Sequence, residues 1–88
     1  PIGKDVRVFP NPVYDLIQVV FTMTEREPIQ IELFDVDGRL VRLLYKDAPK
    51  TGENRLTFNK GVLSPGTYLL SIRSNTQILH NEKLVIVD

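Results

Sequence analysis

The sequence lacks cysteine and tryptophan altogether, and His80 is its single histidine. The absence of cysteine excludes disulfide bonds, thiolate nucleophiles and cysteine-ligated zinc sites. Eleven acidic and eleven basic residues cancel to a net charge of zero, so the basic excess with which nucleic-acid-binding proteins contact phosphates is missing. No apolar run approaches the roughly 20 residues that a helix needs to cross a bilayer. We therefore expect neither a nucleic-acid partner nor a membrane-spanning segment.

Short apolar runs separated by frequent turn residues make up most of the 88 residues. Apolar and polar side chains alternate from Ile29 to Asp35 and again from Tyr68 to Arg73, which is the period of a half-buried strand. Asp37-Gly38 lies between two such runs and indicates a β-hairpin turn. These signals predict an all-β, immunoglobulin-like antiparallel β-sandwich of about seven strands. The expected strands are Val6–Phe9, Leu16–Phe21, Ile29–Val36, Leu40–Tyr45, Asn54–Phe58, Thr67–Ser74 and Gln77–Val87.

The same alternation predicts which side chains form the core and which face solvent. In the last expected strand, Leu84 and Ile86 should point inward. Lys83, Val85 and Val87 should then point outward. The predicted core residues are Ile31, Leu33, Leu70, Ile72 and Leu84.

Residues that carry chemistry in enzymes are sparse here. His80 lies in the last expected strand, and no Gly-x-Ser-x-Gly sequence offers a serine nucleophile to accompany it. Asp35-Val36-Asp37-Gly38 looks like part of a calcium loop, but that register puts Leu33 and Leu44 at ligand positions. A hairpin turn in which an aspartate accepts backbone N–H groups is expected instead. We predict no catalytic residue, no metal site and no cofactor. The glutamates expected on the solvated surface are Glu25, Glu27, Glu32 and Glu53.

Five motifs succeed one another along nearly the whole chain. They are Val8-Phe9-Pro10-Asn11-Pro12, Leu33-Phe34-Asp35-Val36-Asp37-Gly38-Arg39-Leu40-Val41, Gly52-x-Asn54-x-Leu56, Leu63-Ser64-Pro65-Gly66-Thr67-Tyr68 and Lys83-Leu84-Val85-Ile86-Val87. In this order and at this spacing, they resemble the C-terminal sorting domain of the type IX (Por) secretion system, which is found at the ends of secreted Bacteroidetes proteins. The resemblance implies a domain over residues 6–88 that is preceded by a linker stub over residues 1–5.

The motif residues also have structural interpretations. Pro10 and Pro12 restrict φ and cannot donate to a ladder, so they should end the first strand. Phe9 is expected to face the core, and the ring of Tyr68 can fill the core while its hydroxyl reaches an edge. Whether such residues build the fold or contact a partner stays open at this point. The sorting-motif residues that the resemblance implies are Pro10, Asn11, Pro12, Asp37, Gly38, Arg39, Gly66, Tyr68, Lys83, Val85 and Val87.

The resemblance implies a signal rather than an enzyme. A cargo domain N-terminal to residue 1 would be exported to the periplasm, and the type IX machinery would recognise the folded tag. The cargo would then cross the outer membrane to the cell surface or the medium. A sortase-like protease would usually cut before the tag, upstream of Val6, because strand pairing protects the residues after Val6.

The segment Lys83 to Asp88 is the expected recognition surface, either through its outward face or through an open strand edge that a partner could pair with. An alternative interpretation is an accessory immunoglobulin-like spacer or glycan-binding module of a secreted multidomain protein.

Overall fold

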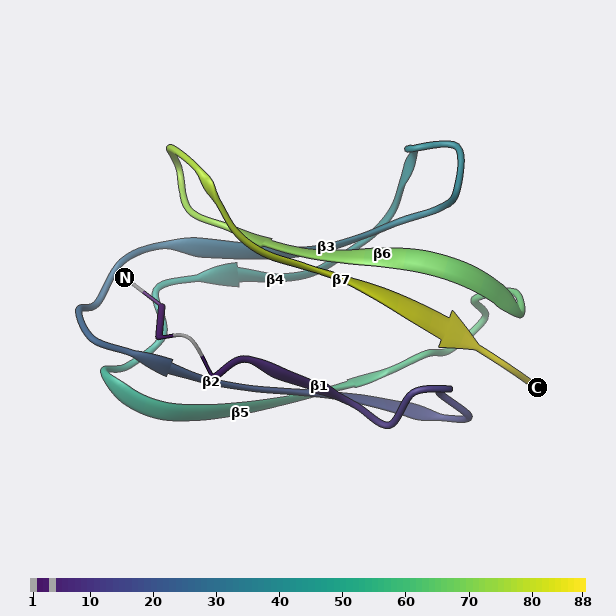
Figure 1. Cartoon of the computed structure of the whole chain (residues 1–88), viewed down its shortest axis with the longest axis horizontal. Helices are drawn as coiled ribbons and strands as arrows, with labels where there is room; N and C mark the ends of the chain where they lie inside the picture. The colour runs from purple at the N-terminus through teal and green to yellow at the C-terminus, as the bar shows by residue number, and fades with distance from the viewer. Residues whose placement is uncertain (1, 4) are drawn as a thin grey trace.

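Two antiparallel β-sheets pack face to face in a computed structural model that describes residues 2, 3 and 5–88 (Figure 1). Pro1 and Lys4 of the expected linker stub lie outside the described residues. One sheet has the strand order β1-β2-β5, and the other has the order β4-β3-β6-β7. The strands are β1 (Arg7–Phe9), β2 (Leu16–Met23), β3 (Ile29–Phe34), β4 (Leu40–Asp47), β5 (Gly52–Asn59), β6 (Gly66–Arg73) and β7 (Ile78–Ile86).

The predicted immunoglobulin-like sandwich of seven strands is confirmed, with small differences at the strand ends. Strand β2 runs two residues beyond the expected end at Phe21, because Met23 still pairs with Gly52 of β5. Strand β3 stops at Phe34 instead of Val36, because the Asp35 N–H already donates to the Arg39 carbonyl and closes the hairpin. Within residues 2, 3 and 5–88, no helix is long and apolar enough to cross a membrane.

The core lies between the two sheets and is formed by alternate side chains of their inner faces. The five predicted core residues are all 0% exposed. They meet a second layer of inward-facing side chains from β2, among them Ile17, Val19 and Phe21. The period of two in the sequence therefore identified the inner faces correctly.

The burial of Glu32 differs from what the sequence predicted. Glu32 was expected on the solvated surface, yet it is 5% exposed. It lies in the middle of the outer face of the four-stranded sheet, where Arg73 of β6 covers it. The Arg73 Nε donates to the Glu32 Oε1 at 2.7 Å, so the buried carboxylate has a charged partner. A central position in a four-stranded sheet buries even an outward-facing side chain when its neighbours are long.

The replacement of Leu70 with alanine tests the assignment of the core. The truncated side chain leaves a cavity at a fully buried site, so the free energy of unfolding should fall by about 2–5 kcal/mol. Leu69→Ala is the matched control, because Leu69 is the adjacent leucine on the outer face and is 39% exposed. Urea unfolding followed by circular dichroism measures both variants. Equal losses in the two variants would contradict the assignment of the faces.

Candidate recognition surface

Asn11 of the Pro-Asn-Pro motif lies against the last strand, although the two are more than 70 residues apart in sequence. Its side-chain Nδ2 donates to the Lys83 carbonyl at 3.2 Å. Its Oδ1 accepts a hydrogen bond from the Val85 N–H at 3.0 Å. A carboxamide carries the same donor and acceptor as a peptide group, so Asn11 pairs with β7 as a neighbouring strand would.

Val13 continues this pairing with its main chain. The Val13 N–H donates to the Val85 carbonyl at 2.7 Å, and the Val87 N–H donates to the Val13 carbonyl at 2.9 Å. The segment forms a parallel bridge opposite Ile86, and the Val13 side chain is completely buried. Strand β7 is therefore held between β6 and residues 11–13. The expectation of an open strand edge over residues 83–87 is wrong, because this short segment covers it.

A second contact fixes the end of the chain. The Lys60 Nζ donates to the Val87 carbonyl at 3.1 Å, and the Lys60 N–H donates to the Asp15 carbonyl at 2.8 Å. Neither the Val13 nor the Lys60 contact was predicted from the sequence. An aliphatic residue directly after Pro12 was a weak local signal for Val13. Lys60 in an Asn-Lys-Gly turn gave no such signal.

The side chains of the last strand alternate as predicted. Leu84 and Ile86 are buried in the core, and Lys83 is exposed on the opposite face. Val85 and Val87 are half-buried rather than freely exposed. Lys83 lies opposite Leu69 of β6. The outward face of β7 thus combines one free cationic side chain with partly covered apolar ones.

The β3–β4 hairpin carries a second group of motif residues. The Asp35 Oδ1 accepts hydrogen bonds from the N–H groups of Asp37 at 2.9 Å and Arg39 at 3.0 Å. The Gly38 N–H donates to the Asp35 carbonyl at 3.0 Å, and Gly38 has a φ of 83°, a value that glycine adopts without strain. The hairpin turn expected from the sequence, with an aspartate that accepts backbone N–H groups, is present.

The charge of Asp35 is part of this turn. The Arg39 N–H that donates to the carboxylate is the main cause that lowers the pKa of Asp35 below its ordinary value of 3.8. Because the folded pKa is lowered, the ionised form stabilises the turn above pH 3.8, and this contribution is lost as the pH falls through the lowered value. The Arg39 guanidinium adds exposed ion pairs to Asp35 at 3.4 Å and Asp37 at 3.7 Å.

Gly66 and Tyr68 open strand β6. Gly66 lies opposite Ile86 of β7. Tyr68 is mostly buried, and its hydroxyl donates to the Ser64 carbonyl at 2.5 Å, so the expected combination of a core ring with an anchored hydroxyl is observed. The ring and the hydroxyl of Tyr68 thus fix the start of β6 against the core and the preceding loop.

The first motif departs from expectation at Phe9. Val8 points into the core and pairs in register with Val19, which leaves Phe9 on the outer face opposite Gln18. The Arg55 guanidinium lies 5.9 Å from the centroid of the Phe9 ring. The expectation that Phe9 faces the core is wrong, because the strand alternation assigns that direction to Val8. Pro10 and Pro12 come next as exposed residues, each after a cis peptide bond.

The motif residues form two groups rather than one. At the β7 edge of the four-stranded sheet, Asn11 bonds to Lys83 and Val85, and Val13 bonds to Val85 and Val87. The β3–β4 hairpin with Asp37, Gly38 and Arg39 belongs to the other side of the sheet, and β6 separates its strands from β7. His80, the single histidine, pairs with Glu82 at 2.9 Å on its own strand. Among the described residues, no three potential metal ligands gather.

Asn11→Ala tests the pairing with the last strand. The variant loses two side-chain hydrogen bonds, each worth about 0.5–1.5 kcal/mol, and because Asn11 is exposed we expect a total loss of stability near 1 kcal/mol. Asn11→Asp keeps the acceptor for Val85 but has no donor for Lys83, so it should also be less stable than the natural chain. Asn75→Ala, at an exposed position of the β6–β7 loop, is the control. Thermal unfolding of the three variants is decisive, and an Asn11→Ala variant as stable as Asn75→Ala would refute the pairing.

Comparison with known proteins gives this surface its context. The chain matches the family model described as the secretion system C-terminal sorting domain over residues 7–87. Among solved structures it is similar to dimeric latent PorU from Porphyromonas gingivalis, with a TM-score of 0.70 and 20% sequence identity. That likeness supports the fold, and it covers 99% of this chain but only 9% of the other. No curated protein matches the chain. Because the family match spans almost every residue, the chain belongs to the C-terminal sorting domains of the type IX secretion system, and it is a sorting signal.

Proposed function

We propose that the type IX machinery recognises this signal in its folded form, through the outward face of β7. The observation that carries the proposal is the pairing of the first motif with the last one. Four hydrogen bonds from Asn11 and Val13 fix the main chain of residues 83–87. A linear peptide would present the same side chains without a fixed direction, whereas the folded domain presents Lys83 and Val85 in one arrangement. Preorganisation of this kind lowers the entropic cost of binding.

The signal serves a cargo that precedes residue 1. In this proposal the cargo enters the periplasm, the machinery binds the folded domain there, and the cargo crosses the outer membrane to the cell surface or the medium. The domain acts as a ligand and a protease substrate rather than as an enzyme.

The proposed cleavage by a sortase-like protease lies upstream of Val6, as expected from the sequence. Proteases require an extended and accessible segment. Ile2 bridges to Met23, and the Gly3 N–H donates to the Thr22 carbonyl at 2.8 Å. This pairing favours a scissile bond before Ile2 over one between Ile2 and Gly3. Mass spectrometry of the released cargo's C-terminus would locate the bond, and a cut between Leu16 and Val87 would contradict a folded signal.

The alternative, a spacer or glycan-binding module, has less support. Glycan-binding sites commonly stack sugars on exposed aromatic rings. Tyr68 is buried and its hydroxyl is engaged, while Tyr14 is the exposed tyrosine. A single exposed ring gives a weak platform for an oligosaccharide.

The double substitution Lys83→Glu with Val85→Ser tests the proposed surface. It reverses the charge and removes the apolar side chain, while the main-chain bonds to Asn11 and Val13 can still form. A secreted reporter should carry the domain at its C-terminus, in a host with a type IX system. We expect the unaltered fusion in the medium or on the surface, and the double variant retained in the periplasm, as measured by fractionation and immunoblotting.

The control makes the same changes of charge and polarity elsewhere. Lys50→Glu with Val62→Ser alters two exposed residues that lie outside β7, so its secretion should equal that of the unaltered fusion. Circular dichroism of the purified domains establishes that both variants fold. If the folded Lys83→Glu, Val85→Ser variant is secreted at the unaltered level, recognition occurs on another surface.

A further inference from the structure

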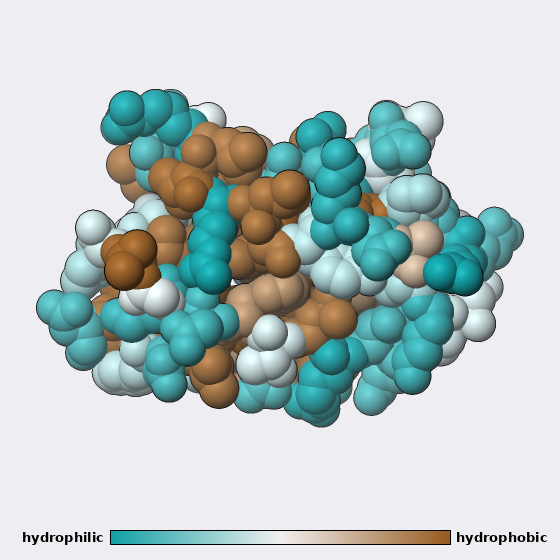
Figure 2. Space-filling model, turned by 180° about the vertical axis from the view of Figure 1, so that it is seen from behind, coloured by the Kyte–Doolittle hydropathy of each residue, from teal (hydrophilic) through white to brown (hydrophobic). Residues whose placement is uncertain are grey.

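The outer face of the four-stranded sheet is hollowed into a trough. The β3–β4 and β6–β7 hairpins rise above this sheet at its opposite ends (Figure 1). Between them is an open cavity of about 810 Å³. Because the hairpins stand at opposite strand ends, the trough runs across the strands rather than along them. Figure 2 shows the two raised ends in profile at the top of the molecule, with a hollow between them.

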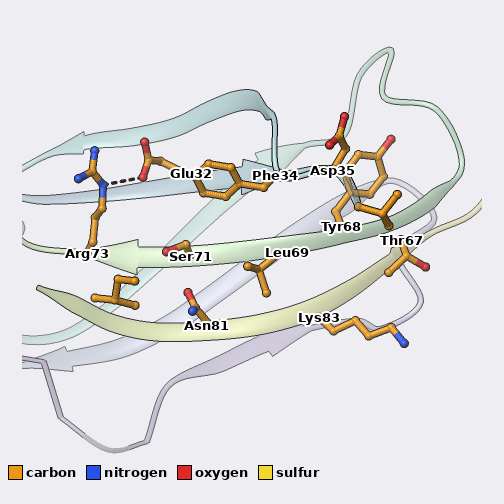
Figure 3. A pocket seen from close by; sticks show the side chains of 13 residues that line it. Glu32, Phe34, Asp35, Thr67, Tyr68, Leu69, Ser71, Arg73, Asn81 and Lys83 are labelled. Carbon is orange, nitrogen blue, oxygen red and sulfur yellow. Dashed lines mark hydrogen bonds and ion pairs between the residues drawn. The ribbon is translucent and has the colours of Figure 1, made fainter.

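The floor of the trough is an apolar row that crosses the sheet. Phe34 pairs with Leu69, and Leu69 pairs with Lys83. The first two are apolar and line the cavity, and Leu69 is 39% exposed. Figure 3 shows Phe34, Leu69 and Lys83 on this face, with the Arg73–Glu32 ion pair at one side. Exposed apolar side chains in one continuous row are typical of an interaction surface rather than of a solvated sheet.

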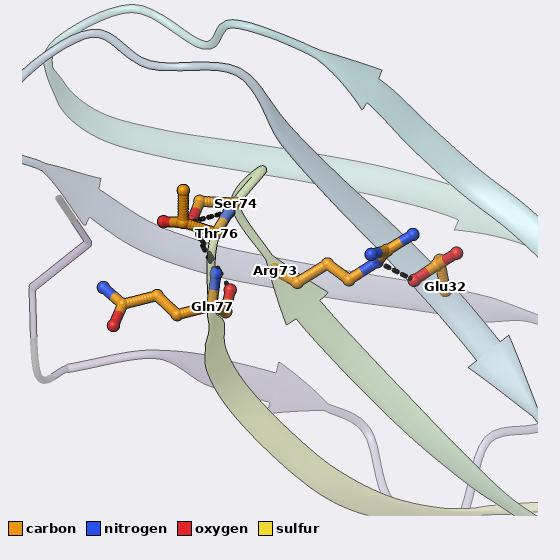
Figure 4. A network of polar contacts seen from close by, with 5 residues as sticks. All are labelled: Glu32, Arg73, Ser74, Thr76 and Gln77. Carbon is orange, nitrogen blue, oxygen red and sulfur yellow. Dashed lines mark hydrogen bonds and ion pairs between the residues drawn. The ribbon is translucent and has the colours of Figure 1, made fainter.

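Both walls add an apolar side chain and are held rigid by their own hydrogen bonds. Val36 on the β3–β4 hairpin is 77% exposed, and Ile78 beside the β6–β7 hairpin is 63% exposed, and both line the cavity. The Asp35 carboxylate closes the first wall by accepting two N–H groups of its turn. In the second wall the Ser74 N–H donates to the Gln77 carbonyl at 2.9 Å, and the Ser74 Oγ accepts from the Gln77 N–H at 3.3 Å (Figure 4). The trough is therefore already formed in the free domain.

The charge that remains available in the trough is positive. The Asp35 carboxylate is engaged by N–H groups of its own turn and by Arg39. The Glu32 carboxylate is buried and bound by Arg73, whose side chain is still 45% exposed. Lys83 is exposed at the β7 end of the apolar row. An occupant should therefore bring apolar side chains for the floor and walls, and a carboxylate for Lys83 and Arg73.

We propose that the trough binds an extended, apolar and acidic peptide segment of a partner protein. The raised hairpins would hold a second flat sheet away from the floor, whereas a single extended chain fits between them. The three strands that line the trough, β3, β6 and β7, lie about 4.8 Å apart and span roughly 10 Å, which an extended segment crosses in about three residues. This binding site does not depend on where the secretion machinery docks on β7, although both surfaces include Lys83.

The test is a nuclear magnetic resonance titration of the ¹⁵N-labelled chain. The probes are two synthetic peptides of about six residues, one alternating leucine with glutamate and the other alternating leucine with lysine. The acidic peptide should shift the amides of Phe34, Val36, Leu69 and Ile78 in a saturable way, and it should bind at least about tenfold more tightly than the basic one. Lys83→Glu should abolish or reverse this preference.

Leu69→Glu should weaken binding of the acidic peptide at least about tenfold, because it places a like charge on the floor. Val62→Glu, at a fully exposed loop position outside the trough, should bind as the unaltered chain does. The spectrum itself reports whether each variant folds. If Leu69→Glu does not fold, Val36→Glu on the β3–β4 hairpin makes the same test.

Equal binding of both peptides, or shifts confined to other faces, would overturn the proposal. So would sedimentation that shows the unaltered chain as a dimer and Leu69→Glu as a monomer, since the occupant would then be a second copy.

Discussion

The last strand of this domain is hydrogen-bonded along both of its edges. The direction of its outward side chains, Lys83 among them, depends on that arrangement. Strand β6 pairs with one side of β7, and residues 11–13 pair with the other. An edge strand normally exposes unpaired N–H and C=O groups, which attract other chains during folding and transport. Here a side-chain amide and a single buried valine satisfy these groups over residues 83–87, so the end of the chain is fixed although it belongs to the outermost strand.

This pairing explains why motifs at the two ends of the chain belong together. The Pro-Asn-Pro segment is not a separate feature from the closing Lys83–Val87 strand, because Asn11 bonds to that strand directly. Lys60 in the middle of the chain adds a third contact at Val87. A sorting signal that is read as a folded surface needs such contacts, since the side chains of a frayed last strand would have no fixed direction. The same rigidity supports the trough, whose Lys83 lies on this strand.

Much of the fold was predictable because strand periodicity depends on local sequence. Alternation identified Leu33, Leu70 and Leu84 as core residues, and the Asp37-Gly38 pair located a hairpin. The errors arose where a residue's environment depends on distant neighbours. Glu32 is buried because Arg73 crosses over it, and the edge of β7 is closed by residues that lie more than 70 positions earlier.

The candidate surface was only partly accessible to sequence reasoning for the same reason. Motif order identified Asn11 and Lys83 as important, and alternation gave the outward direction of Lys83. Neither could show that the two residues are bonded, because hydrogen bonds across a sheet edge leave no local pattern. The trough was equally hidden, since its floor combines residues of three strands whose register becomes known only in the folded molecule.

Hydrogen exchange of the Val85 and Val87 amides in the unaltered domain shows whether residues 11–13 hold the last strand. Asn11 and Val13 are the partners of these two N–H groups. Both amides should exchange far more slowly than those of an exposed loop such as the one around Val62, because the hydrogen bond of each amide must break before the amide can exchange. If Val85 and Val87 exchange as fast as the loop amides, the last strand has an open edge and residues 11–13 do not hold it.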